Sequence, residues 1–319
     1  MGNNTDNKTS GSRYTAGPAG DGIREFAEDV RERLQRWYGE RYRVEVKDTL
    51  KNNGLRLTGL CISETGGQNT DIAPVIYLDG YYAHGLDVES TCRAVMELRG
   101  QCAGCGCFDT SAITDFGKAR ERICCRLVNA DANRELLATL PHRPYLDMAV
   151  VYYMEMGTGT ETTATANVTD SIMRAWGVDE ETLYGLASRN TPELLGFRLT
   201  PIMDILKGLT GTDTEELERI GGNGPEMYVV SNRSGHFGAC VMLRKEVLEW
   251  FAGRTGRSFY ILPSSIHETI FLPVRGGEDT EALGQMVREI NAKVLEPEEI
   301  LSDHVYYYST ETGDVSIVA

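Results

Sequence analysis

The sequence predicts an α+β protein in which antiparallel sheets are built from hairpins, with helices packed on them, mainly on one face. Two observations carry this prediction. One is a hairpin signal in the N-terminal part, and the other is a pattern in the C-terminal part that occurs twice in succession: strand, polar loop, strand, helix. The two copies begin at residues 227–232 and 259–264. One fold hosts many functions, so this architecture does not indicate a reaction by itself.

Composition places the chain among folded globular proteins. Of its 319 residues, 41% are hydrophobic and 25% are charged, which is enough to bury a core. The formal net charge of −15 opposes a nonspecific grip on a phosphate backbone, so we expect no nucleic-acid partner. No stretch approaches the roughly 20 apolar residues of a membrane helix, and the N-terminus lacks the regions of a secretory signal. We therefore expect a soluble, acidic protein in the cytoplasm, with no membrane attachment.

The chain divides by composition into a tail and two folded parts. Residues 1–21 are rich in Gly, Asn, Thr and Ser, and they carry too few apolar side chains for burial to offset the entropy of ordering them. We predict a flexible tail over residues 1–21, an N-terminal α+β part over residues 22–143, and a C-terminal α+β part over residues 144–319 that contains the repeated units. The two parts are expected to be separate domains or one body.

The N-terminal part contains the clearest local signal. Residues 42–46 and 55–60 alternate apolar and polar side chains on either side of Asn52-Asn53-Gly54, and Asn-Gly readily adopts the left-handed angles of a tight turn. We therefore predict a hairpin. Apolar spacings of three and four predict an amphipathic helix over residues 23–38. The other elements expected here are a strand at 74–78 and helices at 88–98, 115–129 and 133–140.

The C-terminal part begins with an apolar run, residues 145–156, whose β-branched and aromatic side chains predict a largely buried strand. Residues 160–168 are expected to pair with it. Asp179 is predicted to cap a helix, because its carboxylate can accept from the first free N–H groups. The other elements expected are a helix at 170–176, a short helix after residue 201, repeat strands at 227–232, 239–243, 259–264 and 269–273, a helix after each repeat, and a last strand at 304–309.

Short motifs along nearly the whole chain resemble a known family. They are Lys51-Asn52-Asn53-Gly54, Leu140-Pro141-His142-Arg143, Trp176-Gly177-Val178, Asn190-Thr191-Pro192, residues 260–268 and residues 301–306. Together and in this order they resemble the bacterial family called domain of unknown function 5688, from about residue 23 to residue 308. The resemblance implies no particular activity, substrate or cofactor.

A cysteine cluster lies outside that family pattern. Cys102, Cys105 and Cys107 form a C-x-x-C-x-C run, and Cys124-Cys125 follow one predicted helix later. Thiolates at this spacing could hold zinc or an iron–sulfur centre. The alternative is a set of reduced thiols, because zinc sites usually pair two knuckles and because adjacent residues point about 100° apart on a helix. We predict no cofactor and keep a thiol metal site as the alternative.

The second repeat loop combines a hydroxyl, an imidazole and a carboxylate. Ser264, Ser265, His267 and Glu268 lie there, and aligning the repeats places His236 in the equivalent loop of the first copy. Neighbours in sequence rarely align as a catalytic triad, and no G-x-S-x-G elbow surrounds either serine. We therefore predict that the serines satisfy backbone groups of the turn and that the loop is a binding surface.

Ionisable residues also mark both sides of the predicted buried strand. Asp147 interrupts its apolar run, and a carboxylate there needs a partner, which Arg143 or His142 could supply from nearby in sequence. A structural ion pair is the simpler interpretation, and a catalytic acid is the alternative. His304, which follows Asp303, invites the same account.

No phosphate-binding glycine loop and no H-E-x-x-H motif occurs in the sequence. Without a complete catalytic constellation, the sequence favours a cytoplasmic bacterial binding or adaptor protein without catalytic activity, whose protein or small-molecule partner is unidentified. One alternative is a hydrolase-type enzyme that uses His267 and Glu268 with His142, Asp147 or His304 brought near by folding. The other is the thiol metal site.

Overall fold

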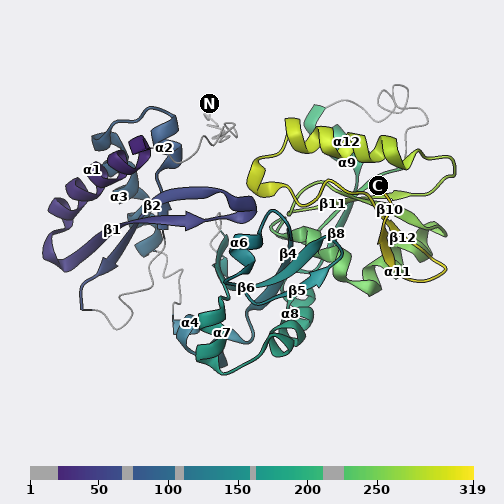
Figure 1. The fold of residues 1–319 in the computed structure, drawn as a ribbon, viewed down its shortest axis with the longest axis horizontal. Coiled ribbons are helices and arrows are strands. Elements are labelled where there is room, and N and C mark those ends of the chain that lie inside the picture. Colours follow the sequence, from purple (N-terminus) through teal and green to yellow (C-terminus); the bar gives the residue numbers. More distant parts are fainter. Residues whose placement is uncertain (1–20, 67–74, 105–110, 159–162, 211–225) are drawn as a thin grey trace, which may run out of the picture. The chain divides into compact units, whose positions relative to one another are not determined.

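The structure is a computed structural model that describes residues 21–66, 75–104, 111–158, 163–210 and 226–319 (Figure 1). It confirms an α+β fold whose sheets are antiparallel. The chain forms two compact units, one from residues 1–50 and 55–99 and the other from residues 51–54 and 100–319. Each unit is described by itself below.

The first unit has a three-stranded sheet of order β1-β2-β3, with helices packed against it. Val44 faces Ile62 across the first strand pair, and both lie in one core with Val30 and Leu34. The hairpin and the helices expected near residues 23–38 and 88–98 are confirmed. The elements are α1 (Asp21–Tyr38), η1 (Gly39–Arg41), β1 (Tyr42–Leu50), β2 (Arg56–Glu64), β3 (Val75–Tyr77), α2 (Asp79–Ala83) and α3 (Val88–Gly104).

The hairpin turn, η2 (Asn52–Gly54), is grouped with the second unit. Asn53 has φ 56° and Gly54 has φ 76°, and this left-handed backbone explains why the turn needs Asn-Gly chemistry. The backbone N–H of Asn53 donates to Asn133 Oδ1 at 2.7 Å, and its side-chain Nδ2 donates to the carbonyl of Ile300 at 2.7 Å. The turn is therefore anchored by hydrogen bonds to distant segments of the second unit.

The second unit contains two antiparallel sheets. In one, β6 (Met148–Thr158) pairs with β4 (Ile123–Asn129), β5 (His142–Tyr145) and β7 (Thr163–Asn167). The other has the order β13-β12-β10-β11-β9-β8. Its strands are β8 (Arg198–Pro201), β9 (Tyr228–Ser231), β10 (Phe259–Pro263), β11 (Thr269–Pro273), β12 (Tyr306–Tyr308) and β13 (Val315–Ile317).

Short and long helices connect these strands. They are α4 (Ser111–Thr114), α5 (Phe116–Ala119), α6 (Arg134–Leu137), α7 (Asp170–Trp176), α8 (Glu180–Leu195), α9 (Ile202–Thr210), η3 (Gly238–Leu243), α11 (Lys245–Thr255), α12 (Thr280–Lys293) and η4 (Pro297–Glu299). Asp179 caps α8 as expected, since its carboxylate accepts from the N–H of Thr182 at 2.9 Å. A boundary near residue 143 would cut the sheet that β4 and β6 share, so that position falls inside the second unit.

The six-stranded sheet has helices on both faces rather than mainly on one. Alternate residues of β10 point in opposite directions: Phe259 and Ile261 pack in one core with Phe251 of α11, whereas Tyr260 and Leu262 pack in another with Val287 of α12. All five residues of β10 are buried. A strand without polar alternation is typical of a sheet that is covered on both sides.

The prediction of a helix over residues 115–129 is correct for the first turn only and wrong for the rest. Asp115 caps α5 by accepting from the N–H of Gly117 at 2.9 Å, but the chain then forms strand β4. Strand β4 pairs along its whole length with the buried strand β6, so the apolar side chains on both faces of β4 are buried. Tertiary burial here outweighs the local helical pattern. The helix expected at 133–140 is confined to the single turn of α6.

The strand expected over residues 239–243 is also wrong, because these residues form the 3₁₀ helix η3. Phe237 has φ 56°, and a Cβ at Gly238 would lie 2.1 Å from Ser231 Oγ, so the chain turns sharply and closely here. Strand β9 pairs with β11 and β8 instead. The second copy does form the predicted strand, loop, strand and helix; the first does not. None of the helices in the described part of the chain is long and apolar enough to cross a membrane.

Candidate functional site

The predicted binding loop joins β10 to β11 in the second unit. Ser265 is buried, its Oγ accepts from the backbone N–H of His267 at 3.0 Å, and its own N–H donates to the carbonyl of Glu268 at 3.1 Å. This hydroxyl therefore satisfies the turn, as the sequence interpretation held, and it is not placed as a nucleophile. Ser264 and Glu268 are half-buried.

The His267 ring is held by the turn before η3. The backbone N–H of Phe237 donates to His267 Nδ1 at 3.2 Å, so the neutral ring carries its proton on Nε2. Nε2 lies 3.8 Å from Glu299 Oε1. Burial lowers the pKa of His267, because the charged form is poorly solvated there. The Nδ1 lone pair is occupied and is not open to accept a substrate proton.

The two loop histidines, His236 and His267, lie close together, although the first copy of the predicted repeat does not form its second strand. The ring of His236 lies 5.1 Å from that of His267, centroid to centroid, and Ser231 Oγ donates to the carbonyl of His267 at 2.8 Å. Burial, the second ring and Arg126 together lower the pKa of His236 to about 4. Both imidazoles are therefore neutral at physiological pH.

Arg126 of β4 is a site residue that sequence reasoning missed. Its Cζ lies 4.3 Å from the centroid of the Phe237 ring, and Nη2 donates to Asn167 Oδ1 at 3.1 Å. Burial lowers the pKa of Arg126 to about 10, so the guanidinium is still charged at neutral pH. It was missed because it lies within a segment that the sequence assigned to a helix. Its charge disfavours a proton on either neighbouring histidine.

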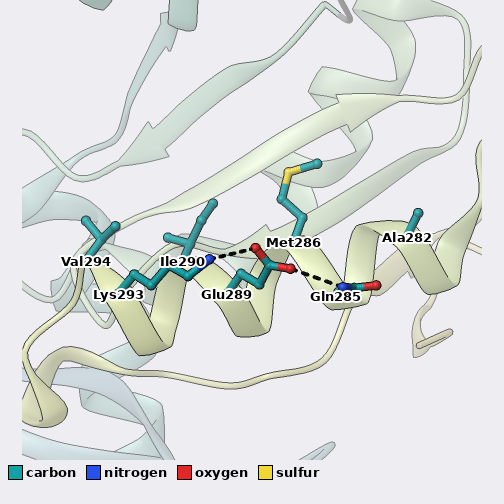
Figure 2. A pocket seen from close by; sticks show the side chains of 7 residues that line it. All are labelled: Ala282, Gln285, Met286, Glu289, Ile290, Lys293 and Val294. Carbon is teal, nitrogen blue, oxygen red and sulfur yellow. Dashed lines mark hydrogen bonds and ion pairs between the residues drawn. The ribbon is translucent and has the colours of Figure 1, made fainter.

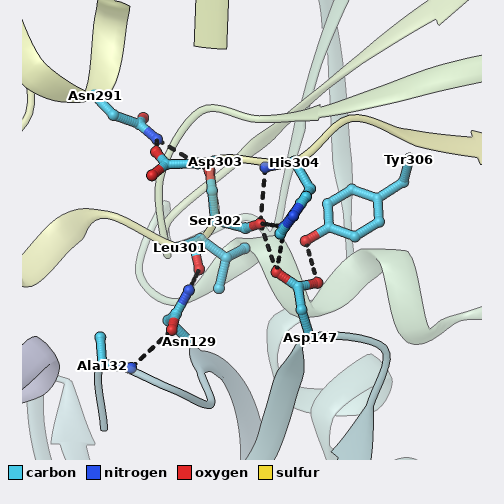
Figure 3. Close-up of polar contacts among 9 residues, drawn as sticks. All are labelled: Asn129, Ala132, Asp147, Asn291, Leu301, Ser302, Asp303, His304 and Tyr306. Atoms are coloured by element: carbon cyan, nitrogen blue, oxygen red, sulfur yellow. Dashed lines mark hydrogen bonds and ion pairs between the residues drawn. The ribbon is translucent and has the colours of Figure 1, made fainter. Parts of the chain in front are cut away.

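A second polar cluster surrounds Asp147, at the turn between β5 and β6 (Figure 3). Ser302 Oγ and His304 Nδ1 lie 2.7 and 3.0 Å from Asp147 Oδ2, and Tyr306 Oη donates to Oδ1 at 2.7 Å. Tyr306 and Ser302 are buried. Both carboxylate oxygens are thus satisfied, as a partly buried charge requires.

The prediction that Arg143 or His142 is the partner of Asp147 is therefore wrong. Arg143 Nη2 instead pairs with Glu180 Oε2 at 2.9 Å, and His142 Nδ1 contacts the backbone carbonyl of Leu140 at 2.8 Å. His142, Arg143 and Asp147 are close in sequence, but β5 leads the first two side chains away from the turn. The actual partners lie more than 150 residues further along the chain.

The Asp147 cluster has part of the chemistry of an acid–base site. Asp147 holds Nδ1 of His304, no described residue hydrogen bonds to Nε2, and the His304 side chain is 47% exposed. This is how a carboxylate orients a general base. Ser302 Oγ, however, lies on the Nδ1 side and donates to Asp147, so the three residues do not form a Ser-His-Asp triad. Within the described chain, no hydrogen bond links this cluster to His267.

The cysteine prediction falls only in part on described residues. Cys105 and Cys107, and the side chain of Cys102, lie outside the described residues. Cys124 and Cys125 lie on β4 and not on a helix, and burial raises their pKa values to about 12 and about 11. Buried thiols of this kind are inert. No group of three or more His, Cys, Asp and Glu side chains among the described residues is arranged to hold a metal ion.

Several motif residues support the fold around these clusters. Asn190 Nδ2 donates to the carbonyls of Arg120 and Ile123, at 2.8 and 3.0 Å, which ties α8 to the start of β4. Asp303 Oδ1 accepts from Asn291 of α12 at 2.7 Å. These two motif residues thus lie at junctions between elements of the second unit.

A family described as "Family of unknown function (DUF5688)" matches residues 23–310. The chain belongs to this family. The resemblance found in the sequence is confirmed, with nearly the same limits. No curated protein and no solved structure matches the DUF5688 chain.

The DUF5688 chain also presents an exposed apolar row that the sequence analysis did not single out. Met286, Ile290 and Val294 are 47%, 39% and 70% exposed and follow one side of α12 and its end (Figure 2). A spacing of four residues places them on one face, and this spacing could have been read from the sequence. A hollow of about 320 Å³ follows the row, lined by Ala282, Gln285, Met286, Glu289, Ile290, Lys293 and Val294.

Proposed function

We propose that this DUF5688 protein is a binding or adaptor protein of the bacterial cytoplasm, without catalytic activity, that docks an amphipathic helix of a partner protein along α12. The observation that carries the proposal is the row of Met286, Ile290 and Val294, which is exposed over three successive turns. Scattered single apolar residues are normal on a surface, whereas a continuous row is typical of an interaction site.

The partner's shape follows from what borders the row. Glu289 accepts from Gln285 at 3.1 Å and from Lys293 at 2.9 Å, so an ordered polar edge runs beside the apolar side chains (Figure 2). A partner must match an apolar row and a polar edge of the same length. An amphipathic helix with anchors three or four residues apart has this pattern.

The row is presented on a rigid support. The opposite side of α12 is buried: Val287 packs with Leu272, and Asn291 Nδ2 donates to the carbonyl of Ser302 at 3.0 Å. A docking surface of fixed shape lowers the entropic cost of binding. The lack of catalysis is supported by the loop, in which Ser265 and the Nδ1 atom of His267 are occupied by backbone N–H groups.

The test compares two aspartate substitutions on one helix. Ile290→Asp places a charge within the row, and Ala292→Asp places the same charge on an exposed residue of α12 that does not line the hollow. Affinity capture with quantitative mass spectrometry, followed by titration of the purified partner, should show at least about tenfold weaker binding for Ile290→Asp and little change for Ala292→Asp. Equal recovery of every captured protein by the two variants would contradict the proposal, provided that near-UV circular dichroism shows both are folded.

A second candidate function is acid–base hydrolysis at His304, favoured by the 3.0 Å contact that orients its ring on Asp147. It replaces the His267 version of the hydrolase hypothesis. If it holds, a panel of ester and phosphoester substrates should include one that the wild type hydrolyses and His304→Gln does not. Turnover that is indistinguishable between the two proteins on every substrate would remove this candidate.

A further inference from the structure

Two aromatic and three arginine side chains from separate elements gather on the second unit. We name Phe197, Arg233, Arg244, Trp250 and Arg254 the arginine–aromatic surface. Phe197 lies between α8 and β8, Trp250 and Arg254 lie on α11, Arg244 directly precedes α11, and Arg233 follows β9.

Direct contacts join these five residues. The rings of Phe197 and Trp250 meet edge to face, with centroids 5.6 Å apart. The guanidinium of Arg254 lies 5.7 Å from the Trp250 ring, and that of Arg244 lies 5.6 Å from the Phe197 ring. Guanidinium groups at such distances are attracted to the ring faces.

Gly196 links the remaining arginine to the surface. A Cβ at this residue, where φ is 60°, would lie 2.9 Å from Arg233 Nε. The Arg233 side chain therefore packs directly against the backbone of Gly196. The carbonyl of Gly196 accepts from Arg244 Nη1 at 3.2 Å. The five side chains therefore form one continuous surface.

The surface combines accessible aromatic area with unneutralised positive charge. Trp250 is 44% exposed, and Arg233 and Arg254 are exposed. Arg244 pairs with Glu246 at 2.8 Å, but in the described part of the chain no carboxylate pairs with Arg233 or Arg254. In a chain with net charge −15, cations that no described carboxylate neutralises are available to carboxylates from outside.

We propose that the arginine–aromatic surface binds an acidic segment of a partner protein that carries an apolar side chain. The planar guanidinium groups of Arg233 and Arg254 donate hydrogen bonds to the carboxylates, and the apolar side chain packs on Trp250 and Phe197. A short acidic segment fits better than nucleic acid, because a long polyanion would meet the negative field of the whole chain. This surface lies on residues other than the α12 row, and its chemistry is different.

The test uses a short fluorescent peptide that alternates Glu with Leu and Phe, and the full-length protein. Fluorescence anisotropy should show saturable binding that weakens with added salt. Arg254→Glu should weaken it at least about fivefold and Trp250→Ala at least about tenfold. Arg120→Glu, an exposed charge reversal beyond α5, is the matched control and should leave binding unchanged. Trp250→Phe should retain most of the affinity.

Three outcomes would overturn the inference. They are no saturable binding of the peptide, equal binding by the wild type and Arg254→Glu, and tighter binding of a single-stranded oligonucleotide than of the peptide. A Lys-for-Glu version of the peptide should not bind. Ile290→Asp on α12 should bind the acidic peptide like the wild type, so the failure of this inference and the failure of the α12 proposal are distinguishable.

Discussion

At the scale of single residues, hydrogen bonds decide which sequence candidates are available for chemistry. His267, Ser265 and Asp147 were all noted from residue type alone, yet each is committed to a partner: a backbone N–H for the first two and three side chains for the third. The partners of Asp147 could not be read from the sequence, because side chains more than 150 residues apart meet only through the tertiary fold.

The neutral His236 makes stability depend on pH. Its pKa is lowered to about 4 in the folded chain, against about 6.5 when unfolded. Between these two values the unfolded chain binds more protons, so stability falls as the pH falls through this window and levels off below it. From about pH 7 to about pH 5 we expect a loss of about 2 kcal/mol from this residue.

Urea unfolding at both pH values, for the wild type and His236→Gln, measures this contribution. The glutamine variant should lose about 2 kcal/mol less than the wild type over the same interval, because its side chain does not titrate. Identical losses for the two proteins would show that His236 is not held neutral by its surroundings.

Gly238 sets the close approach that brings the two histidine loops together. A Cβ there would lie 2.1 Å from Ser231 Oγ and 2.5 Å from the carbonyl oxygen of His267. Gly238→Ala should therefore destabilise the protein by about 3 kcal/mol or more. Gly253→Ala is the control, since no described atom outside the neighbouring turns of α11 lies within 4 Å of the new Cβ and alanine should stabilise α11 by roughly 0.5 to 1 kcal/mol. Thermal unfolding that ranks the two variants in the opposite order would contradict this account.

At the scale of elements, the sequence predicted the correct secondary structure where the local turn and capping residues and the tertiary burial favour the same element. The β1–β2 hairpin was predictable because Asn53 and Gly54 favour the left-handed turn and the flanking residues alternate. Strand β4 was not, because a run that begins with a good helix cap at Asp115 becomes a strand only through its pairing with β6. The end of β9 is similar: the turn at Phe237 and Gly238 converts an apolar run into η3.

The attachment of α8 to β4 gives a prediction at this scale. Both side-chain N–H groups of the buried Asn190 face backbone carbonyls, those of Arg120 and Ile123. Asn190→Ala removes the donor from the buried carbonyl contact of Ile123 and from the partly buried one of Arg120, and it should cost about 2 kcal/mol. Asn190→Asp should cost more, because its carboxylate oxygen faces a carbonyl oxygen. Denaturant midpoints should follow the order wild type, Ala, Asp; an Asp variant as stable as the wild type would contradict these contacts.

At the scale of the whole molecule, the family and the α+β class were accessible from the sequence because motifs and strand patterns extend along the chain. The surfaces proposed for binding were less accessible, since they depend on which apolar and charged residues stay uncovered. The α12 row follows from a spacing of four residues, but the arginine–aromatic surface joins side chains from four places in the sequence. Only the folded structure shows that no carboxylate among the described residues pairs with Arg233 or Arg254.

The metal content of the whole protein tests the expectation that no cofactor is bound. The cysteines whose side chains are described are all buried, and Cys124 and Cys125, as successive strand residues, point to opposite faces of β4. A thiol metal site would therefore depend on Cys102, Cys105 and Cys107. Elemental analysis of protein purified without added metal should find zinc and iron well below one atom per chain. One zinc or iron per chain in the wild type, lost in Cys105→Ser but retained in Cys240→Ser, would instead establish the thiol site at this cluster.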